Sequence, residues 1–250
     1  MKNTILVQGA MEVELKIIKE NILDSEEVII DGFKFVKGKL GDYNIVLSQT
    51  NIGTINAALA TLIGIKEFKP IFIINQGVAG GTQKDIHKGD LVIGKACVNV
   101  NSYETKQRNY GEGSAPLEWK IKKFTSDDEN EDSSVGINAD NRLVEFTRQI
   151  SYENGNVHYG ILGSGDVWNK EVDRIIWLNE KLNTISADME SIGAYSVASK
   201  YNVPIVGIRV ISDNVLVEEN YERNVAQIVQ EYVVKYIKEI ISKENICKLL

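Results

Sequence analysis

Short apolar runs alternate with longer amphipathic stretches along this chain. The runs predict strands at Thr4–Gln8, Glu27–Ile30, Lys34–Lys39, Asn44–Gln49, Ile71–Asn75, Asp90–Lys95, Val157–Leu162 and Pro204–Ser212. The stretches with helical period predict helices at Met11–Ile22, Thr54–Phe68, Asn141–Glu153, Met189–Tyr201 and Tyr221–Ser242. This alternation predicts an α/β fold of three layers, in which helices flank a central mixed, twisted sheet.

The composition narrows the class of protein. With 250 residues, 43% hydrophobic and 25% charged, the chain is expected to form a single domain over 1–250. A net charge of -7 without a basic cluster argues against nucleic acid as a partner. The first apolar run is too short for a leader or a membrane span, which predicts a cytoplasmic protein without membrane contact.

Few residues could bind a metal or form a crosslink. Cys97 and Cys247 are predicted to be reduced buried thiols, and His87 and His158 to be structural. We therefore predict no metal and no cofactor. The acidic stretch 126–134 has no apolar period and is expected to be a solvated loop.

Functional residues of open α/β sheets gather beyond the carboxyl ends of strands. Four predicted strand ends qualify here, and they lead into Gly9-Ala10, Asn75–Gly81, Gly163–Asp166 and Asp213. We expect these ends to form one crevice.

Helical periodicity distinguishes two neighbouring glutamates. Glu14 borders the apolar stripe of the helix predicted from Met11, whereas Glu12 is predicted to face Lys16 and Lys19 in water. A carboxylate against an apolar surface favours a functional role for Glu14.

A second pair of acids begins another predicted helix. Glu190 is expected to face inward, either as a functional group or as the buried partner of Arg209. Asp188 is expected to cap the helix that starts at Met189.

Asp213 follows nine mainly apolar residues, so its carboxyl group should have limited access to water. Such a site favours the protonated form that a general acid requires, although a turn or capping role is the alternative.

The glycine-rich segment Asn75–Gly81 is expected to be a loop. It lacks the Lys-Ser/Thr of a phosphate-binding loop and the spacing of a dinucleotide motif. Its glycines would allow close approach to a flat, neutral ligand, with a plain tight turn as the alternative.

These motifs together resemble the signature set of the 5'-methylthioadenosine/S-adenosylhomocysteine nucleosidases, in the superfamily of the nucleoside phosphorylases. The resemblance runs in colinear order from about residue 3 to about residue 245 and is weak over 99–137, a divergent insert or loop. It implies a nucleoside phosphorylase-like fold, a homodimer in which the neighbouring subunit closes the pocket for the 5'-group, and a role in methionine salvage.

The resemblance also implies roles for single residues. Glu14 would activate water and Asp213 would protonate the purine at N7, while Met189 and Glu190 would hold the ribose. The remaining positions would line the small-molecule nucleoside at the base, the sugar and the 5'-group: Ile52, Val78, Ala79, Gly80, Trp168, Asn169 and Tyr221. Val78 and Asp188 depart from the family pattern, where a hydroxyl residue and a glutamate are common.

The implied reaction is hydrolysis of the N-ribosidic bond of a purine nucleoside, with 5'-methylthioadenosine or S-adenosylhomocysteine as substrate and adenine as product. One alternative is a phosphorylase, but the places where phosphorylases carry arginines read Ala10-Met11-Glu12 and Asn75-Gln76 here. The other is a nucleoside-binding module without catalysis.

Overall fold

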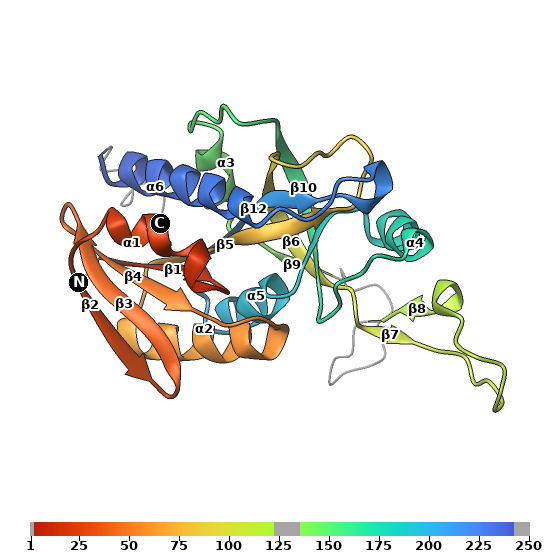
Figure 1. Cartoon of the computed structure of the whole chain (residues 1–250). Helices are drawn as coiled ribbons and strands as arrows, with labels where there is room; N and C mark the ends of the chain where they lie inside the picture. Colours follow the sequence, from red (N-terminus) through yellow and green to blue (C-terminus); the bar gives the residue numbers. More distant parts are fainter. Residues whose placement is uncertain (1–2, 123–135, 243–250) are drawn as a thin grey trace.

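A mixed ten-stranded sheet forms the middle layer of the computed structural model, which describes residues 3–122 and 136–242 (Figure 1). Nine strands follow the order β11-β10-β6-β12-β5-β1-β4-β3-β2, and β9 pairs with β6. Their bounds are β1 Thr4–Gly9, β2 Leu23–Ile30, β3 Phe33–Leu40, β4 Tyr43–Gln49, β5 Phe72–Gly81, β6 Leu91–Asn99, β9 Gly136–Asn138, β10 Val157–Ser164, β11 Thr184–Asp188 and β12 Ile205–Asp213.

Helices cover both faces of this sheet. In Figure 1, α1 (Lys16–Glu20), α3 (Asn141–Thr147) and α6 (Ala226–Ser242) lie above it, and α2 (Thr54–Phe68) and α5 (Ser191–Lys200) lie below. One apolar cluster packs under α3 and α6, and another includes residues of α2 and α5. The expected three-layer α/β architecture with a mixed sheet is confirmed.

Half of the sheet closes on itself. β5, β12, β6, β10 and β11 pair in sequence, and β11 then returns to β5 through the antiparallel pairs Ser186↔Gly81 and Ala187↔Gly80. This closed ring places the end of β11 beside the ends of β5 and β12.

A small hairpin extends away from the ring. It comprises β7 (Tyr103–Glu104), the 3-10 turn Pro116–Glu118 and β8 (Lys120–Ile121), and it follows β6 in the chain (Figure 1). The helix α4 (Val172–Leu182) contacts both the 3-10 turn of this hairpin and β11 of the ring.

Several local predictions are wrong. The helix expected over Met11–Ile22 is a 3-10 turn at Glu12–Glu14 followed by the five-residue α1. The expected loop Asn75–Gly81 is the second part of β5, which pairs with β12 and β11 and so continues as a strand. The helices expected from Asn141, Met189 and Tyr221 are shorter, and α4, β11 and the hairpin were not expected.

The structure tests only part of the predictions for the cysteines and for the acidic loop. Cys97 is a buried free thiol, while Cys247 and the acidic segment 126–134 lie outside the described residues. Within the described ranges, no helix has the length and apolar character to cross a membrane.

Candidate active site

A cavity of about 360 Å³ opens where the ring strands end. The two predicted catalytic acids and every other predicted site residue line it: Glu14, Asp213, Ile52, Val78, Ala79, Gly80, Trp168, Asn169, Met189, Glu190 and Tyr221. Residues far apart in the sequence thus meet in one place. The cavity is also lined by Met11, Ser212 and Arg223, which sequence reasoning did not select.

Glu14 is fixed by main-chain amides. Its Oε2 accepts from the N–H groups of Ala10 (2.8 Å) and Met11 (3.0 Å), and its Oε1 accepts from Val78 N–H (3.1 Å). A Cβ at Gly77 would lie 2.7 Å from Oε1, so only glycine lets β5 approach this closely. The carboxylate is therefore held in one orientation at the cavity wall.

Burial dominates the protonation of Glu14. The residue is 2% exposed, and this burial raises the pKa of the carboxyl group even though the amide bonds oppose the shift. A buried carboxylate with a raised pKa binds a proton more readily than one in water, as a general base requires.

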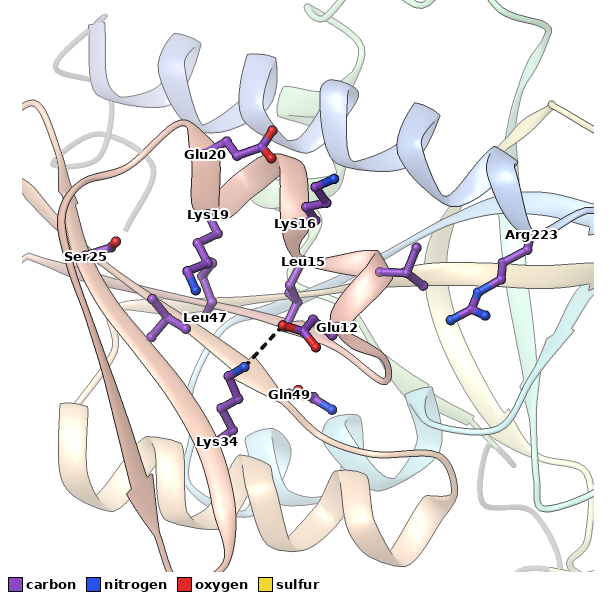
Figure 2. Close-up of a pocket in the computed structure, with 12 residues that line it drawn as sticks. Glu12, Leu15, Lys16, Lys19, Glu20, Ser25, Lys34, Leu47, Gln49 and Arg223 are labelled. Carbon is purple, nitrogen blue, oxygen red and sulfur yellow. Dashed lines mark hydrogen bonds and ion pairs between the residues drawn. The ribbon is translucent and has the colours of Figure 1, made fainter.

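Glu12 is exposed and ion-paired as predicted, but its partner is Lys34 instead of Lys16 or Lys19. Its Oε1 lies 3.3 Å from Lys34 Nζ (Figure 2). Lys19 pairs with Glu27 instead. The break between the 3-10 turn and α1 removes the helical register on which the pairing with Lys16 and Lys19 was based. Glu12 lines a separate hollow of about 690 Å³ that shares Arg223 with the candidate site.

Asp188, not Glu190, is the buried partner of Arg209. Arg209 Nε donates to Asp188 Oδ2 (3.0 Å), and the rest of the guanidinium bonds Asn75 and Ser191. Burial is the largest single influence on Asp188 and would raise its pKa, but the charge of Arg209 and the hydrogen bonds from Ser191 and Ser164 together outweigh it, so the pKa is lowered. Asp188 Oδ1 also accepts from the amides of Glu190 and Ser191 ahead of α5, as a capping group does.

This arrangement leaves Glu190 available to a ligand. Its Oε1 accepts one bond from Gly53 N–H (3.1 Å). Burial, and then the neighbouring charge of Asp188, raises the pKa of Glu190 to about 7. Near neutral pH its carboxyl group can therefore both donate and accept hydrogen bonds.

Asp213 ends β12 opposite Gly80 of β5. It is 7% exposed, and Ser212 Oγ donates to its Oδ1 at 2.6 Å. A Cβ at Gly80 would be in ordinary van der Waals contact with the nearer Asp213 oxygen, at 3.8 Å. The carboxyl group lines the cavity and can therefore contact a ligand there.

Two aromatic side chains stand at the mouth of the cavity. The rings of Trp168 and Tyr221 meet edge to face with centroids 5.4 Å apart. The segment carrying Trp168 is anchored by Asp166, whose carboxylate oxygens accept from Thr54 N–H (2.7 Å) and Thr54 Oγ1 (2.6 Å). These bonds join the segment to the start of α2.

Comparison with known proteins assigns the chain to a superfamily. The family model of the phosphorylase superfamily matches residues 4–242, nearly the whole chain. The fold and the matched range together assign this chain to that superfamily.

Similar proteins specify the family. The chain is 30% identical over 212 residues to a 5'-methylthioadenosine/S-adenosylhomocysteine nucleosidase of Bacillus thuringiensis subsp. konkukian, covering 84% of this chain and 85% of the relative. A Bacillus anthracis protein with the same name matches to the same extent. The chain belongs to this nucleosidase family, and it is an N-glycosyl hydrolase.

Solved structures share the fold. The Neisseria meningitidis nucleosidase in complex with methylthio-immucillin-A gives a TM-score of 0.77 at 24% identity, covering 95% of this chain and 99% of the other. Futalosine hydrolase of Helicobacter pylori gives 0.74 at 22% identity, covering 96% and 98%. The fold is thus common to nucleosidases with differently named substrates.

Proposed function

We propose that this enzyme hydrolyses the N-ribosidic bond of 5'-methylthioadenosine, S-adenosylhomocysteine or both, and releases adenine. The observation that supports the proposal best is the convergence of Glu14, Glu190 and Asp213 on one cavity. The names of the similar Bacillus proteins point to these two substrates.

The acids divide the reaction between them. Breaking the bond builds positive charge on the sugar while the base leaves with the bonding electrons. Asp213 donates a proton to N7 of the leaving base, Glu14 takes a proton from the attacking water, and Glu190 with Met189 holds the ribose. The negative charge of Glu14 also stabilises the cationic sugar.

Water, not phosphate, is the proposed nucleophile. Among the cavity residues the cation is Arg223, an exposed side chain, while Arg209 is committed to Asp188 and Asn75. A phosphate dianion next to Glu14 would lack the charge-assisted bonds that such an anion needs.

Incubation with 5'-methylthioadenosine in phosphate-free buffer tests the proposal. We expect adenine and free 5-methylthioribose, separated by chromatography. A strict requirement for phosphate, or a ribose 1-phosphate product, would contradict hydrolysis. Binding of the nucleoside without release of base would favour a module without catalysis.

We also propose a homodimer. Ile52 at the cavity and Ile55 and Leu59 on α2 are apolar and 53%, 72% and 46% exposed, which is unusual for neighbouring side chains on a free surface. A second subunit seated there would cover them and narrow the mouth of the cavity. Light scattering after gel filtration should give twice the chain mass, and Ile55→Glu should halve it.

The cysteine content supports a proposal about the compartment. With two cysteines and Cys97 as a buried free thiol, the chain suits a reducing compartment, and we propose that it acts in the cytoplasm in methionine salvage.

A further inference from the structure

A second cavity of about 210 Å³ adjoins the candidate active site, between the ring, α4 and the hairpin segment. It will be called the side chamber. Six wall residues belong to both cavities: Gly80, Val167, Asn169, Ala187, Asp188 and Asp213. The two cavities therefore meet at the end of the site that holds Asp213.

The shared wall residues show which part of a bound nucleoside would lie nearest to the side chamber. Glu14, Met189 and Glu190, the proposed ribose side, line the first cavity alone. A nucleoside whose sugar lies at these residues and whose base lies at Asp213 extends its base toward the side chamber. The edge of the six-membered ring that is remote from the sugar then faces the opening.

The side chamber contains a cation that the proposed reaction does not use. Arg174 is 8% exposed, and its guanidinium carbon lies 4.2 Å from the ring centroid of Trp177, 5.2 Å from that of Trp119 and 5.4 Å from that of Tyr103. Its Nη1 donates to Pro116 O (2.9 Å). Within residues 3–122 and 136–242, no carboxylate forms an ion pair with it.

This guanidinium is held in place without a direct ion pair among the described residues, although it feels the charge of Glu171, which lines the same chamber. The aromatic faces and one carbonyl hold the group in place, and a guanidinium carries five N–H donors. A carboxylate that entered the side chamber would gain bonds of the charge-assisted kind, which are the strongest that this side chain makes.

A second polar group in the wall has no hydrogen-bond partner among the described residues. Ser186 is fully buried on β11, and no hydrogen bond to its Oγ is found in the described part of the chain. Buried hydroxyl groups are normally hydrogen-bonded, so an unsatisfied one in the wall of a cavity is a donor that a ligand atom reaching this wall would satisfy. Ser186 and Arg174 line the same chamber.

We propose that the side chamber receives a carboxylate-bearing substituent on the six-membered ring of the leaving purine, with Arg174 binding the carboxylate and Ser186 donating a hydrogen bond to the substituent. This assignment of substrate class rests on the proposed function. A volume of about 210 Å³ equals roughly seven water molecules at about 30 Å³ each, which is enough for a short acidic chain on the exocyclic nitrogen.

Three nucleosides test the proposal in the full-length protein. They are 5'-methylthioadenosine, its N6-carboxymethyl derivative and the N6-carbamoylmethyl derivative, a neutral group of nearly the same shape. Release of each base is followed by chromatography, and kcat/KM is compared. We expect the parent enzyme to cleave the acid about 10-fold or more better than the amide.

Two variants assign the residues. Arg174→Gln should lower kcat/KM for the acid about 10- to 100-fold and leave the value for 5'-methylthioadenosine within about twofold. Ser186→Ala removes one buried hydroxyl group at little structural cost, and it should lower kcat/KM for the acid about threefold or more. A thermal melt shows whether Arg174→Gln is folded. If it is not, the proposal is decided by the ratio of kcat/KM for the acid to kcat/KM for the amide in the parent enzyme, together with the result for Ser186→Ala.

Failure of this proposal can be told from failure of the proposed function. If 5'-methylthioadenosine itself yields no adenine, the proposed function is wrong. If it is cleaved but neither derivative is, the side chamber does not receive a substituent. If the amide is cleaved as well as the acid, or Arg174→Gln affects both equally, the assignment of a carboxylate is overturned.

Discussion

Replacing Glu14 by Gln tests the proposed activation of water most directly. The amide keeps the size of the side chain but cannot take a proton from water. Loss of a general base lowers turnover about 10²- to 10⁴-fold, which corresponds to about 3 to 5 kcal/mol of activation free energy at 1.36 kcal/mol per tenfold change. Substrate binding should remain measurable, because the amide still fills the same space.

The contacts of Glu14 set the expected effect on stability. Three main-chain N–H groups point at the two carboxylate oxygens. With its single carbonyl oxygen at the position of Oε2, the amide keeps two of these bonds and turns its NH₂ group toward Val78 N–H. The lost bond costs about 1 to 3 kcal/mol, and the removal of a buried charge offsets part of it. The variant should therefore stay folded.

Glu12→Gln is the matched control two residues away. Glu12 pairs with Lys34 at 3.3 Å on the surface, with 76% of its side chain exposed. An exposed pair contributes little to stability, so both the melting temperature and kcat should remain near those of the parent. Adenine release and a thermal melt on both variants give the answer. Normal turnover of a folded Glu14→Gln, or a large loss in Glu12→Gln, would refute the placement of the general base.

Further predictions concern the other acids. Asp213→Asn should lower turnover about 10²- to 10⁴-fold with little change in the melt, and normal turnover would reduce Asp213 to a turn residue. Because the pKa of Glu190 is raised from 4.5 to about 7 in the folded protein, its contribution to stability is full below about pH 4.5 and is lost as pH rises through 7. Between pH 4.5 and 7 the melting temperature of the parent should therefore fall relative to that of Glu190→Gln. If the two melting temperatures change with pH in the same way, the raised pKa of Glu190 is contradicted. Asp188→Ala leaves the charge of Arg209 buried and should cost about 3 to 5 kcal/mol in urea unfolding, whereas a loss below about 1 kcal/mol would show that the pair is not needed.

Periodicity predicted the elements that are set by local sequence. The helix Thr54–Phe68 has the expected bounds, and its buried positions recur with helical spacing: Ala57, Ala60, Thr61, Gly64 and Ile65. The meeting of the site residues in one cavity could be predicted for another reason. The carboxyl ends of parallel strands lie at the same edge of a sheet, irrespective of the conformation of the loops that follow them. For this reason Glu14 lies at the cavity although the helix expected around it is broken.

Tertiary pairing decided what the sequence could not predict. The strand Thr184–Asp188 is short and partly polar, and it is a strand because β10 and β5 pair with it on its two sides. The choice of Asp188 over Glu190 as partner of Arg209 depends on the direction in which that strand ends. Arg174 lies on α4, whose amphipathic sequence is typical of a helix and could have been recognised. Nothing local, however, predicts that α4 meets Trp119 of the hairpin to form the side chamber.

The closed ring of strands also determines when in folding the enzyme becomes active. The pairing of Gly80 with Ala187 joins segments more than a hundred residues apart, and contacts of such separation form slowly because a long stretch of chain must first be ordered. Glu14 and Asp213 depend on the same closure, through Val78 and Gly80 of β5. An intermediate with its helices formed and the ring still open would have secondary structure but no site. During refolding, activity should therefore return with the slowest conformational step, later than the recovery of the helical signal.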